Sequence, residues 1–153
     1  MTNHGPQEWR LLDTGPRNAA ENMALDEAIL QARAQGLAPN TIRFLEFDPA
    51  AVLVGFHQSV EQEVRAEFCL DNGIDINRRI TGGGSIYFGS RTLGWEIIAS
   101  KSDLATKIPS FAGQGTFENL CRGVVRALSS LGVEAVYRPK NDMDECRERG
   151  MSY

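Results

Sequence analysis

The segment from residue 77 to residue 87 holds the residues whose types and spacing are best suited to chemistry. Arg78 and Arg79 stand just before three consecutive glycines at 82–84, between two apolar stretches. Consecutive glycines let the backbone approach a ligand closely and present several N–H groups to an anion. An arginine can bind phosphate or carboxylate through two parallel hydrogen bonds. The pattern suits a phosphate or an acyl phosphate, and the alternative is a flexible hairpin connection with two solvated arginines.

The cysteines and histidines exclude several other chemistries. Cys69, Cys121 and Cys146 show no C-x-x-C spacing, so neither a disulfide framework nor a zinc ribbon is expected. His4 and His57 are far apart, and we predict no metal site. The sequence has no G-x-S-x-G elbow and no G-x-x-x-x-G-K-S/T loop, so ATP would have to be bound by another device.

Three of these side chains have a plain structural interpretation. Cys121 falls on an apolar helical stripe and is expected to be a small buried hydrophobe. His57 is interpreted as a residue of a loop or strand end. Cys146 could act as a thioester nucleophile, but no histidine lies near it in the sequence to lower its pKa. A cysteine in a disordered tail is therefore the favoured interpretation of Cys146.

The composition is that of an ordinary soluble globular domain. The chain has 153 residues, of which 42% are hydrophobic and 24% charged, and its formal net charge is −4. Mild acidity argues against non-specific binding to nucleic acid. No apolar run approaches the roughly 20 residues of a membrane span, and the polar start lacks an apolar signal core. These features predict a cytoplasmic location and no membrane partner.

Alternating strands and helices are expected along the chain. Residue periodicity and β-branched content predict strands at residues 8–14, 41–47, 51–56, 74–76, 85–88, 93–99 and 133–137. Pro16 is expected to end the first strand, because proline lacks a backbone donor. Residues 101–116 show little periodicity and are predicted to be a loop.

Three helices are predicted between these strands. The first begins at a capping pair formed by Asn18 and Glu21 and ends near Gly36. Its apolar side chains share one face, namely Leu25, Ala28, Ile29 and Ala32. The second helix, over 59–73, starts at another capping box, and the third, over 117–132, has a clear apolar stripe.

The short connection at residues 89–92 favours an antiparallel hairpin between the strands on either side of it. The sum is an α+β domain with a largely antiparallel sheet flanked by helices.

At this point the segment 78–87 becomes recognisable. It resembles the R-R-x-S/T-G-G-G-A/S-V/I signature of the lipoate–protein ligase A and octanoyltransferase family, which belongs to the biotin/lipoate protein ligase superfamily. Other pieces agree with that family in order and spacing: N-M-A-L-D-E-A at 22–28, T-I-R-F at 41–44, V-L-V-G with a later Gln58 at 52–58, and N-D at 141–142. The match runs from about Trp9 to Asp142.

The resemblance implies a class II biotin/lipoate ligase-like fold and a function in protein lipoylation. Ligases of the family use ATP, with magnesium, to convert lipoate or octanoate into an acyl-adenylate. They then pass the acyl group to a lysine of a carrier domain, in 2-oxoacid dehydrogenases or in the glycine-cleavage H protein. The octanoyltransferase relatives instead take the acyl chain from acyl carrier protein through a cysteine thioester.

The resemblance also implies roles for particular residues. Arg79 would hold the nucleotide phosphate, and Tyr87 would flank the acyl pocket. The cofactor-binding positions carried over are Arg79, Gly82, Gly83, Gly84, Ser85, Ile86 and Tyr87, with the N–H groups of Gly84, Ser85 and Ile86 lining the adenylate. Asn22 and Asp26 could support the site from a helix surface, and the alternative for Asp26 is a solvated carboxylate.

Two departures from the family pattern bear on activity. Phe88 and Gly89 stand where many ligases have His-Asp, and no lysine follows Lys140, where the family has its catalytic lysine. No catalytic residue is therefore assigned. We expect residues 1–142 to be the N-terminal part of a catalytic domain and residues 143–153 to be a non-matching, disordered tail. Either truncation or a short homologue that only binds its ligand would account for this, and truncation is favoured.

Four possibilities remain open. The chain could be a lipoate or octanoate ligase, or an octanoyl transferase. It could also bind an acyl-adenylate or a lipoyl group without turnover, or be an inactive fragment.

Overall fold

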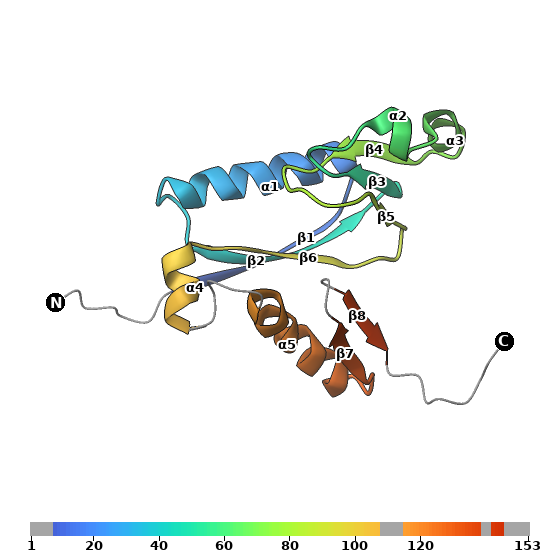
Figure 1. Cartoon of the computed structure of the whole chain (residues 1–153). Coiled ribbons are helices and arrows are strands. Elements are labelled where there is room, and N and C mark those ends of the chain that lie inside the picture. Colours follow the sequence, from blue (N-terminus) through green and yellow to red (C-terminus); the bar gives the residue numbers. More distant parts are fainter. Residues whose placement is uncertain (1–7, 108–114, 139–141, 146–153) are drawn as a thin grey trace. The chain divides into compact units, whose positions relative to one another are not determined.

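A computed structural model of the chain describes residues 8–107, 115–138 and 142–145 (Figure 1). The chain divides into two compact units, residues 1–100 and residues 101–153. Unit 1 contains, in chain order, β1 (Trp9–Arg17), α1 (Ala19–Ala34), β2 (Asn40–Phe47), β3 (Ala51–Val54), α2 (Val60–Glu63), α3 (Ala66–Asp71), β4 (Asp75–Arg78), β5 (Ile86–Phe88) and β6 (Gly94–Ile98). Within the described ranges, no helix is long and apolar enough to cross a membrane.

Two three-stranded sheets organise unit 1, with strand orders β1-β2-β6 and β4-β3-β5 (Figure 1). β2 pairs parallel with β1 and antiparallel with β6, and β3 pairs parallel with β4 and antiparallel with β5. Helix α1 packs on β2 and β4, and α3 packs on β4. Sheets flanked by helices confirm the α+β class expected from the sequence.

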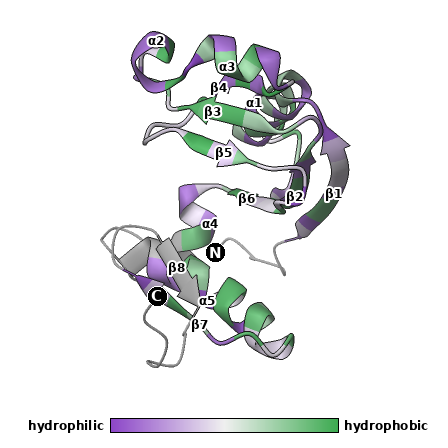
Figure 2. Ribbon diagram, turned by 90° about the vertical axis from the view of Figure 1, so that its right-hand side faces the viewer, coloured by the Kyte–Doolittle hydropathy of each residue, from purple (hydrophilic) through white to green (hydrophobic). Residues whose placement is uncertain are grey.

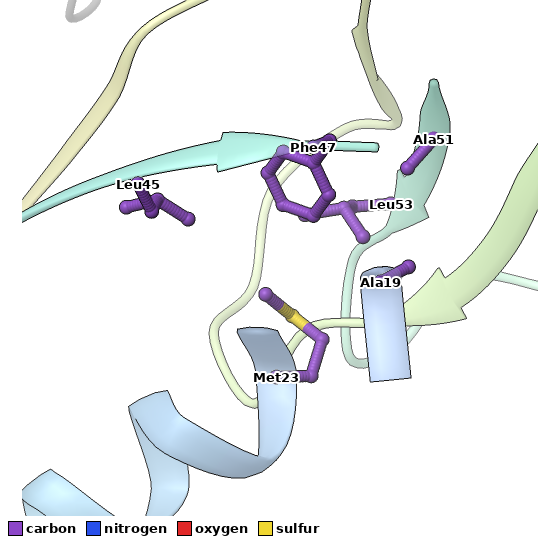
Figure 3. Close-up of a cluster of buried hydrophobic side chains, with 6 residues drawn as sticks. All are labelled: Ala19, Met23, Leu45, Phe47, Ala51 and Leu53. Atoms are coloured by element: carbon purple, nitrogen blue, oxygen red, sulfur yellow. The ribbon is translucent and has the colours of Figure 1, made fainter. Parts of the chain in front are cut away.

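The core of unit 1 lies where α1 meets both sheets. Side chains from α1, β2 and β3 point toward one another there (Figure 3), and the buried set is Ala19, Met23, Leu45, Phe47, Ala51 and Leu53. Phe88 of β5 packs against this set, with its ring centroid 4.6 Å from that of Phe47. The apolar sequence of β3 is visible in Figure 2 as a hydrophobic ribbon, whereas α2 is mainly hydrophilic. The core therefore covers the face of β3 that carries Ala51 and Leu53, while Val52 lies on the opposite face.

The limits of α1 confirm the capping prediction, but its buried face differs from the predicted one. The Glu21 N–H donates to Asn18 Oδ1 at 2.8 Å, and Gly36, two residues beyond the helix, has a left-handed φ of 73°. The predicted apolar face was only partly correct, because Ala28 is exposed. The buried face instead includes the polar residue Asn22, which binds groups on β2.

The prediction that Pro16 ends the first strand was wrong. β1 runs on to Arg17, and its register with β2 shifts between Asp13 and Pro16. Gly15, with φ of 61°, provides the irregularity. β1 is an edge strand of its sheet, where a proline without an N–H does not interrupt a ladder.

The predicted hairpin across residues 89–92 was also wrong. β5 pairs with β3 and β6 pairs with β2, so the two strands belong to different sheets. The sequence signal was a short connection between two apolar runs, and such a connection can also step from one sheet to the next.

The predicted helix over 59–73 is divided into α2 and α3. Val64 ends α2 in an extended conformation, with φ of −132° and ψ of 132°. The expected capping box is absent, because the Ser59 hydroxyl donates to Glu61 Oε2 at 2.6 Å and makes no bond to the start of the helix. A β-branched valine at the break favours the extended backbone.

Unit 2 contains α4 (Lys101–Lys107), α5 (Gly115–Ser130), β7 (Ala135–Arg138) and β8 (Asp142–Glu145). Residues 101–107 are helical, which corrects the predicted loop, while residues 108–114 lie outside the described residues. The amphipathic helix α5 packs on β7, which pairs antiparallel with β8. The tail expected from residue 143 thus begins inside β8, and residues 146–153, with Cys146, lie outside the described residues.

Candidate functional site

The three-glycine segment forms an exposed loop between β4 and β5, at the end of the sheet where the parallel strands β3 and β4 finish. Two backbone hydrogen bonds join the start of this segment to β3 and to the residues just after it. The Arg79 N–H donates to the Val54 carbonyl at 2.9 Å, and the Phe56 N–H donates to the Thr81 carbonyl at 2.9 Å. We call residues 80–85 the glycine loop.

The Arg79 guanidinium binds backbone carbonyls of β3 and of the glycine loop. Nη1 donates to the Leu53 carbonyl at 3.0 Å, and Nη2 donates to the carbonyls of Gly82 at 2.9 Å and Gly84 at 2.8 Å. Burial lowers the pKa of Arg79, but an arginine remains charged at neutral pH. Arg79 therefore links β3 to the glycine loop. The family resemblance had implied a different role for Arg79, namely binding the nucleotide phosphate.

The carbonyl directions determine where the N–H groups of the glycine loop point. In a trans peptide the carbonyl of one residue and the N–H of the next point in opposite directions. The carbonyls of Gly82 and Gly84 turn toward Arg79, and the Gly83 carbonyl turns toward Gly55. The N–H groups of Gly83, Gly84 and Ser85 are consequently directed away from these protein partners. Successive N–H groups directed outward form a concavity that suits an anion.

Arg78 organises the neighbouring turn in the same way. Its Nη1 donates to the carbonyls of Gly55 at 2.9 Å, Phe56 at 3.1 Å and Gln58 at 2.7 Å. The alternative of two solvated arginines is wrong for both residues, since each guanidinium binds main-chain oxygens. His57 lies in this turn, edge-on to the ring of Phe56, as expected for a loop residue.

Replacing Arg79 with lysine should lower the stability, because one ammonium group cannot reach the carbonyls of β3 and of the glycine loop together. Arg79→Lys should lower the free energy of unfolding by about 0.5–1.5 kcal/mol, the range for the net contribution of a hydrogen bond, because the Gly82 and Gly84 carbonyls are exposed to water. Urea unfolding measures the change, and Arg91→Lys at an exposed turn is the matched control. Equal unfolding midpoints for the two variants would contradict the bridging role.

Gly55 and Gly83 each require glycine, for different reasons. A Cβ at Gly55 would lie 2.0 Å from the Gly83 carbonyl oxygen. Gly83 has a φ of 103°, which L-residues with side chains rarely adopt. Gly82 and Gly84 differ from Gly83, because among the described atoms nothing lies within 4 Å of a Cβ built at either position.

Ile86 and Tyr87 of β5 are both exposed, and they face opposite sides of the strand. Tyr87 pairs with Val52 of β3, and both line a hollow of about 450 Å³ under α2 and α3. The remaining lining residues are Glu63, Val64, Arg65, Phe68, Cys69 and Ile74. The hollow is of a size that small ligands occupy, and Tyr87 is the β5 residue in its lining.

A second polar cluster lies inside unit 1, and sequence reasoning did not find its centre. Arg43 of β2 is fully buried, and its Nη1 forms ion pairs with Asp26 and, at 3.2 Å, with Glu96 of β6. Its Nε donates to the Thr14 hydroxyl at 3.0 Å, and its Nη2 donates to the amide oxygen of Asn22. Asn22 in turn donates to the Glu46 carbonyl at 2.8 Å.

This cluster joins α1 to the sheet β1-β2-β6 and gives Asp26 an unusual environment. Burial, followed by the charge of Glu96, raises the pKa of Asp26 to about 7, and Arg43 only partly opposes this. The interpretation of Asp26 as a solvated carboxylate was therefore wrong, since it is ion-paired with a side chain only 16% exposed. A supporting role for Asn22 and Asp26 agrees with this geometry.

The two described cysteines are both buried. Cys69 is 4% exposed and Cys121 is 6% exposed, and burial raises the pKa of the Cys121 thiol. The placement of Cys121 confirms its prediction as a buried hydrophobe. Within the described residues, no group of three or more His, Cys, Asp or Glu side chains could hold a metal ion, so we assign no protein ligands to magnesium.

The family is shown by comparison with known proteins. The model of the lipoyl protein ligase A/B catalytic domain matches residues 18–144. The chain therefore belongs to the lipoyl protein ligase A/B catalytic domain family. This confirms the resemblance drawn from residues 78–87.

Three particular proteins illustrate the similarity. Octanoyltransferase LipM of Symbiobacterium thermophilum is 37% identical over 127 residues, which are 83% of this chain and 44% of that protein. A structure of a bi-partite lipoate protein ligase and its E2 lipoyl domain, from Thermoplasma acidophilum, has a TM-score of 0.75 at 27% identity and covers 92% of this chain and 52% of that chain. A lipoate-protein ligase A bound with ATP has a TM-score of 0.71 at 31% identity, over 88% of this chain and 51% of that chain. The chain thus spans about half the length of these proteins.

Proposed function

We propose that this chain binds a lipoyl or octanoyl group at the glycine loop and takes part in its transfer to the lysine of a lipoyl carrier domain. The carrier would be a domain of a 2-oxoacid dehydrogenase or the glycine-cleavage H protein. The family assignment supports the reaction class, and one observation at the site carries the binding role.

That observation is the contrast among the three glycines. Gly83 is required by the fold itself, because of its left-handed φ. Gly82 and Gly84 are exposed, have no left-handed φ, and would place a Cβ where no described atom lies within 4 Å. Side chains at these two positions would extend into space outside the protein. Their absence leaves that space open for a ligand held against the outward N–H groups.

The site residues then divide into two kinds. The N–H groups of Gly84 and Ser85, which the resemblance implies, and that of Gly83, which replaces Ile86 in the implied set, would donate to the oxygens of a carboxylate, an acyl phosphate or a thioester carbonyl, where negative charge develops during acyl transfer. Tyr87 and the hollow beside Val52 would take the apolar acyl chain. Arg79 and Ile86 border the same loop, Arg79 by fixing the carbonyls and Ile86 as the first residue of β5.

Two routes to the acyl donor fit this site. In the ATP-dependent route the acid becomes an acyl-adenylate, pyrophosphate leaves, and the carrier lysine then displaces AMP. In the thioester route the octanoyl group comes from acyl carrier protein, and the naming of the relative from Symbiobacterium thermophilum as an octanoyltransferase favours this second candidate. The burial of Cys69 and Cys121 favours neither of them as the acceptor of a thioester, since an activated thiol needs an exposed thiolate.

One experiment distinguishes these functions. The full chain is incubated with a lipoyl domain and either ATP, magnesium and lipoate or octanoate, or octanoyl-acyl carrier protein. The intact mass of the lipoyl domain is then measured. A gain of one acyl group in the first mixture identifies a ligase, and a gain in the second identifies a transferase. A lipoyl domain whose acceptor lysine is replaced by arginine is the control.

If neither mixture modifies the acceptor, calorimetry with octanoyl-sulfamoyl-adenosine, a stable analogue of the adenylate, is decisive. Binding without turnover would leave a binding module, and absence of binding would refute the proposal.

Gly84→Ala should separate ligand binding from stability. The added methyl group meets no described atom, so the melting temperature should stay within about 2 °C of the original, while affinity for octanoyl-sulfamoyl-adenosine should fall about tenfold or more. Gly123→Ala in α5, where a Cβ also meets no described atom, is the control and should not change affinity. A variant that binds as tightly as the original would show that the space at Gly84 is not used by the ligand.

A further inference from the structure

Gln58 forms hydrogen bonds with Gly55, Ser85 and Arg78. The site residues inferred from the sequence do not include Gln58. The Gly55 N–H donates to Gln58 Oε1 at 2.8 Å, and the Ser85 hydroxyl donates to the same oxygen at 3.1 Å. The Gln58 N–H donates to the Gly55 carbonyl at 3.0 Å, and the Gln58 carbonyl accepts from Arg78 at 2.7 Å. The side chain therefore joins the end of β3 to the last residue of the glycine loop.

The chemistry of these bonds leaves little freedom. A backbone N–H can only donate, so the side-chain atom of Gln58 that faces Gly55 must be the amide oxygen. That oxygen carries no hydrogen, so the Ser85 hydroxyl must be the donor in the second bond. The hydroxyl proton of Ser85 is then used in the bond to Gln58. The lone pairs of the hydroxyl oxygen remain available to a ligand, next to the outward N–H of Ser85. Gln58 thereby fixes which way the Ser85 hydroxyl is used.

Gly55 lies at the closest contact in the site, where a Cβ would be 2.0 Å from the Gly83 oxygen. Such an approach holds only if both backbones are fixed. Gln58 fixes Gly55 from one side through its amide oxygen and its N–H, and it holds Ser85 on the other side. The Gln58 side chain thus limits the distance between Gly55, just after β3, and Ser85, at the end of the glycine loop.

We propose that Gln58 is a positioning residue that presets the glycine loop for its ligand by holding Gly55 and Ser85 with one amide oxygen. This inference rests on the proposed acyl-binding function, since a preset loop matters only if the loop binds a ligand. Gln58 acts through Gly55 and Ser85 and needs no contact with the ligand. Its loss should therefore change the loop even when no ligand is present.

Hydrogen exchange in the ligand-free full chain tests this directly. The Phe56 amide is the reporter, because it donates to the Thr81 carbonyl of the glycine loop and makes no bond to Gln58. In Gln58→Leu, which keeps the size but not the acceptor, the exchange of the Phe56 and Gly55 amides should be about tenfold faster, as expected for loss of hydrogen bonds worth about that factor. Affinity for octanoyl-sulfamoyl-adenosine should fall by a similar factor.

Gln58→Glu should restore slow exchange, because a carboxylate oxygen accepts from both donors. Gln62→Leu, at an exposed position of α2, is the matched control and should behave like the original chain. If Gln58→Leu fails to fold, Ser85→Ala removes one of the two bonds and should raise the exchange rate of the Phe56 amide by a smaller factor. In chains that do fold, Gln58→Leu combined with Ser85→Ala should exchange no faster than Gln58→Leu alone.

The two proposals fail in different ways. If the original chain does not bind the analogue or modify a carrier, the acyl-binding function is wrong, and the exchange rates still decide whether Gln58 holds the loop. If the original chain binds the analogue, and Gln58→Leu matches Gln62→Leu in both exchange and affinity, Gln58 is not a positioning residue. The same conclusion follows if Ser85→Ala, used in its place, leaves the exchange rate unchanged.

Discussion

Gly55→Ala should reduce affinity for octanoyl-sulfamoyl-adenosine by about a hundredfold or more, and no other single substitution in the site is expected to do as much. The new methyl carbon would lie 2.0 Å from the Gly83 oxygen and 3.0 Å from the Gly83 carbonyl carbon. Both contacts are with main chain, so the glycine loop or the end of β3 must move by about 1 Å or more. A displacement of that size costs about a factor of 100 in the rate at a reacting site, and we expect a loss of similar size in the affinity for an analogue held by the same N–H groups.

The same substitution should also lower the free energy of unfolding by about 1–3 kcal/mol, the range for an overpacked site. Calorimetry measures the affinity and urea unfolding the stability. Gly82→Ala is the control for stability, because it adds a methyl group within the same loop where no described atom lies within 4 Å. If Gly55→Ala were as stable and bound as tightly as the original chain, the close contact of β3 with the glycine loop would be unnecessary.

Arg43→Met should be the most destabilising substitution in unit 1, and its effect should depend on pH. Arg43 is the cation shared by Asp26 and Glu96, and removing one partner of a buried ion pair costs about 3–5 kcal/mol. The loss should be larger at pH 8 than at pH 5.5, because at the lower pH Asp26 can accept a proton and relieve the unpaired charge. Urea unfolding at a series of pH values measures this.

The original chain should itself become less stable as the pH rises from about 4 to about 7. The pKa of Asp26 is raised from 3.8 in the unfolded chain to about 7 in the folded protein, so the folded state holds a proton that the unfolded state has lost. One full proton would give a slope of about 1.4 kcal/mol per pH unit, and the partial exposure of Asp26 should narrow the pH range over which that slope is reached. Above pH 7 this contribution should be level.

Asp26→Asn should remove most of this slope, since asparagine keeps an oxygen for Arg43 and does not titrate. Glu27→Gln, on the exposed side of the same helix, should leave the slope unchanged. A slope that persists in Asp26→Asn would show that the proton resides on another group. Because Glu96 is the second carboxylate on Arg43, Glu96→Gln would then be the variant to examine.

The position of the glycine loop between two strands could be predicted from the sequence, but the direction of its side chains could not. The Arg-Arg and triple-glycine pattern correctly indicated an exposed loop between two strands. The pattern did not reveal that Arg79 faces inward, because a guanidinium can donate either to phosphate or to backbone carbonyls. The distinction depends on the carbonyls of Leu53, Gly82 and Gly84, and a sequence does not show where carbonyls point.

The buried cluster around Arg43 was accessible from a signal that the sequence does contain. In β2, residues 41, 43, 45 and 47 alternate with the others and all face the buried side. Thr41, Leu45 and Phe47 suggest a core face, and the same alternation places Arg43 on it. A buried arginine requires acidic partners, and Asp26 one helix earlier was an available candidate.

The hairpin that was predicted wrongly shows the limit of local signals. Helix capping at Asn18 and Gly36 depends on adjacent residues and was predicted correctly. The separation of β5 from β6 depends on which distant strand each segment joins. Local propensity is a weak guide where tertiary pairing decides.

The inward orientation of Arg78 and Arg79 has a consequence for how ligand selectivity can change in this family of sites. In the proposed function, the surface that a ligand meets at the glycine loop is made of main-chain N–H groups, which every amino acid except proline has, and of the Ser85 hydroxyl. Most substitutions in the loop would then weaken or abolish binding of the acyl head group without redirecting it to a different one. In the same proposal, choice among acyl chains is left to side chains at the hollow, above all Tyr87 and Val52. Recognition of the reacting group and discrimination of the chain are thus separable, and each can vary without the other.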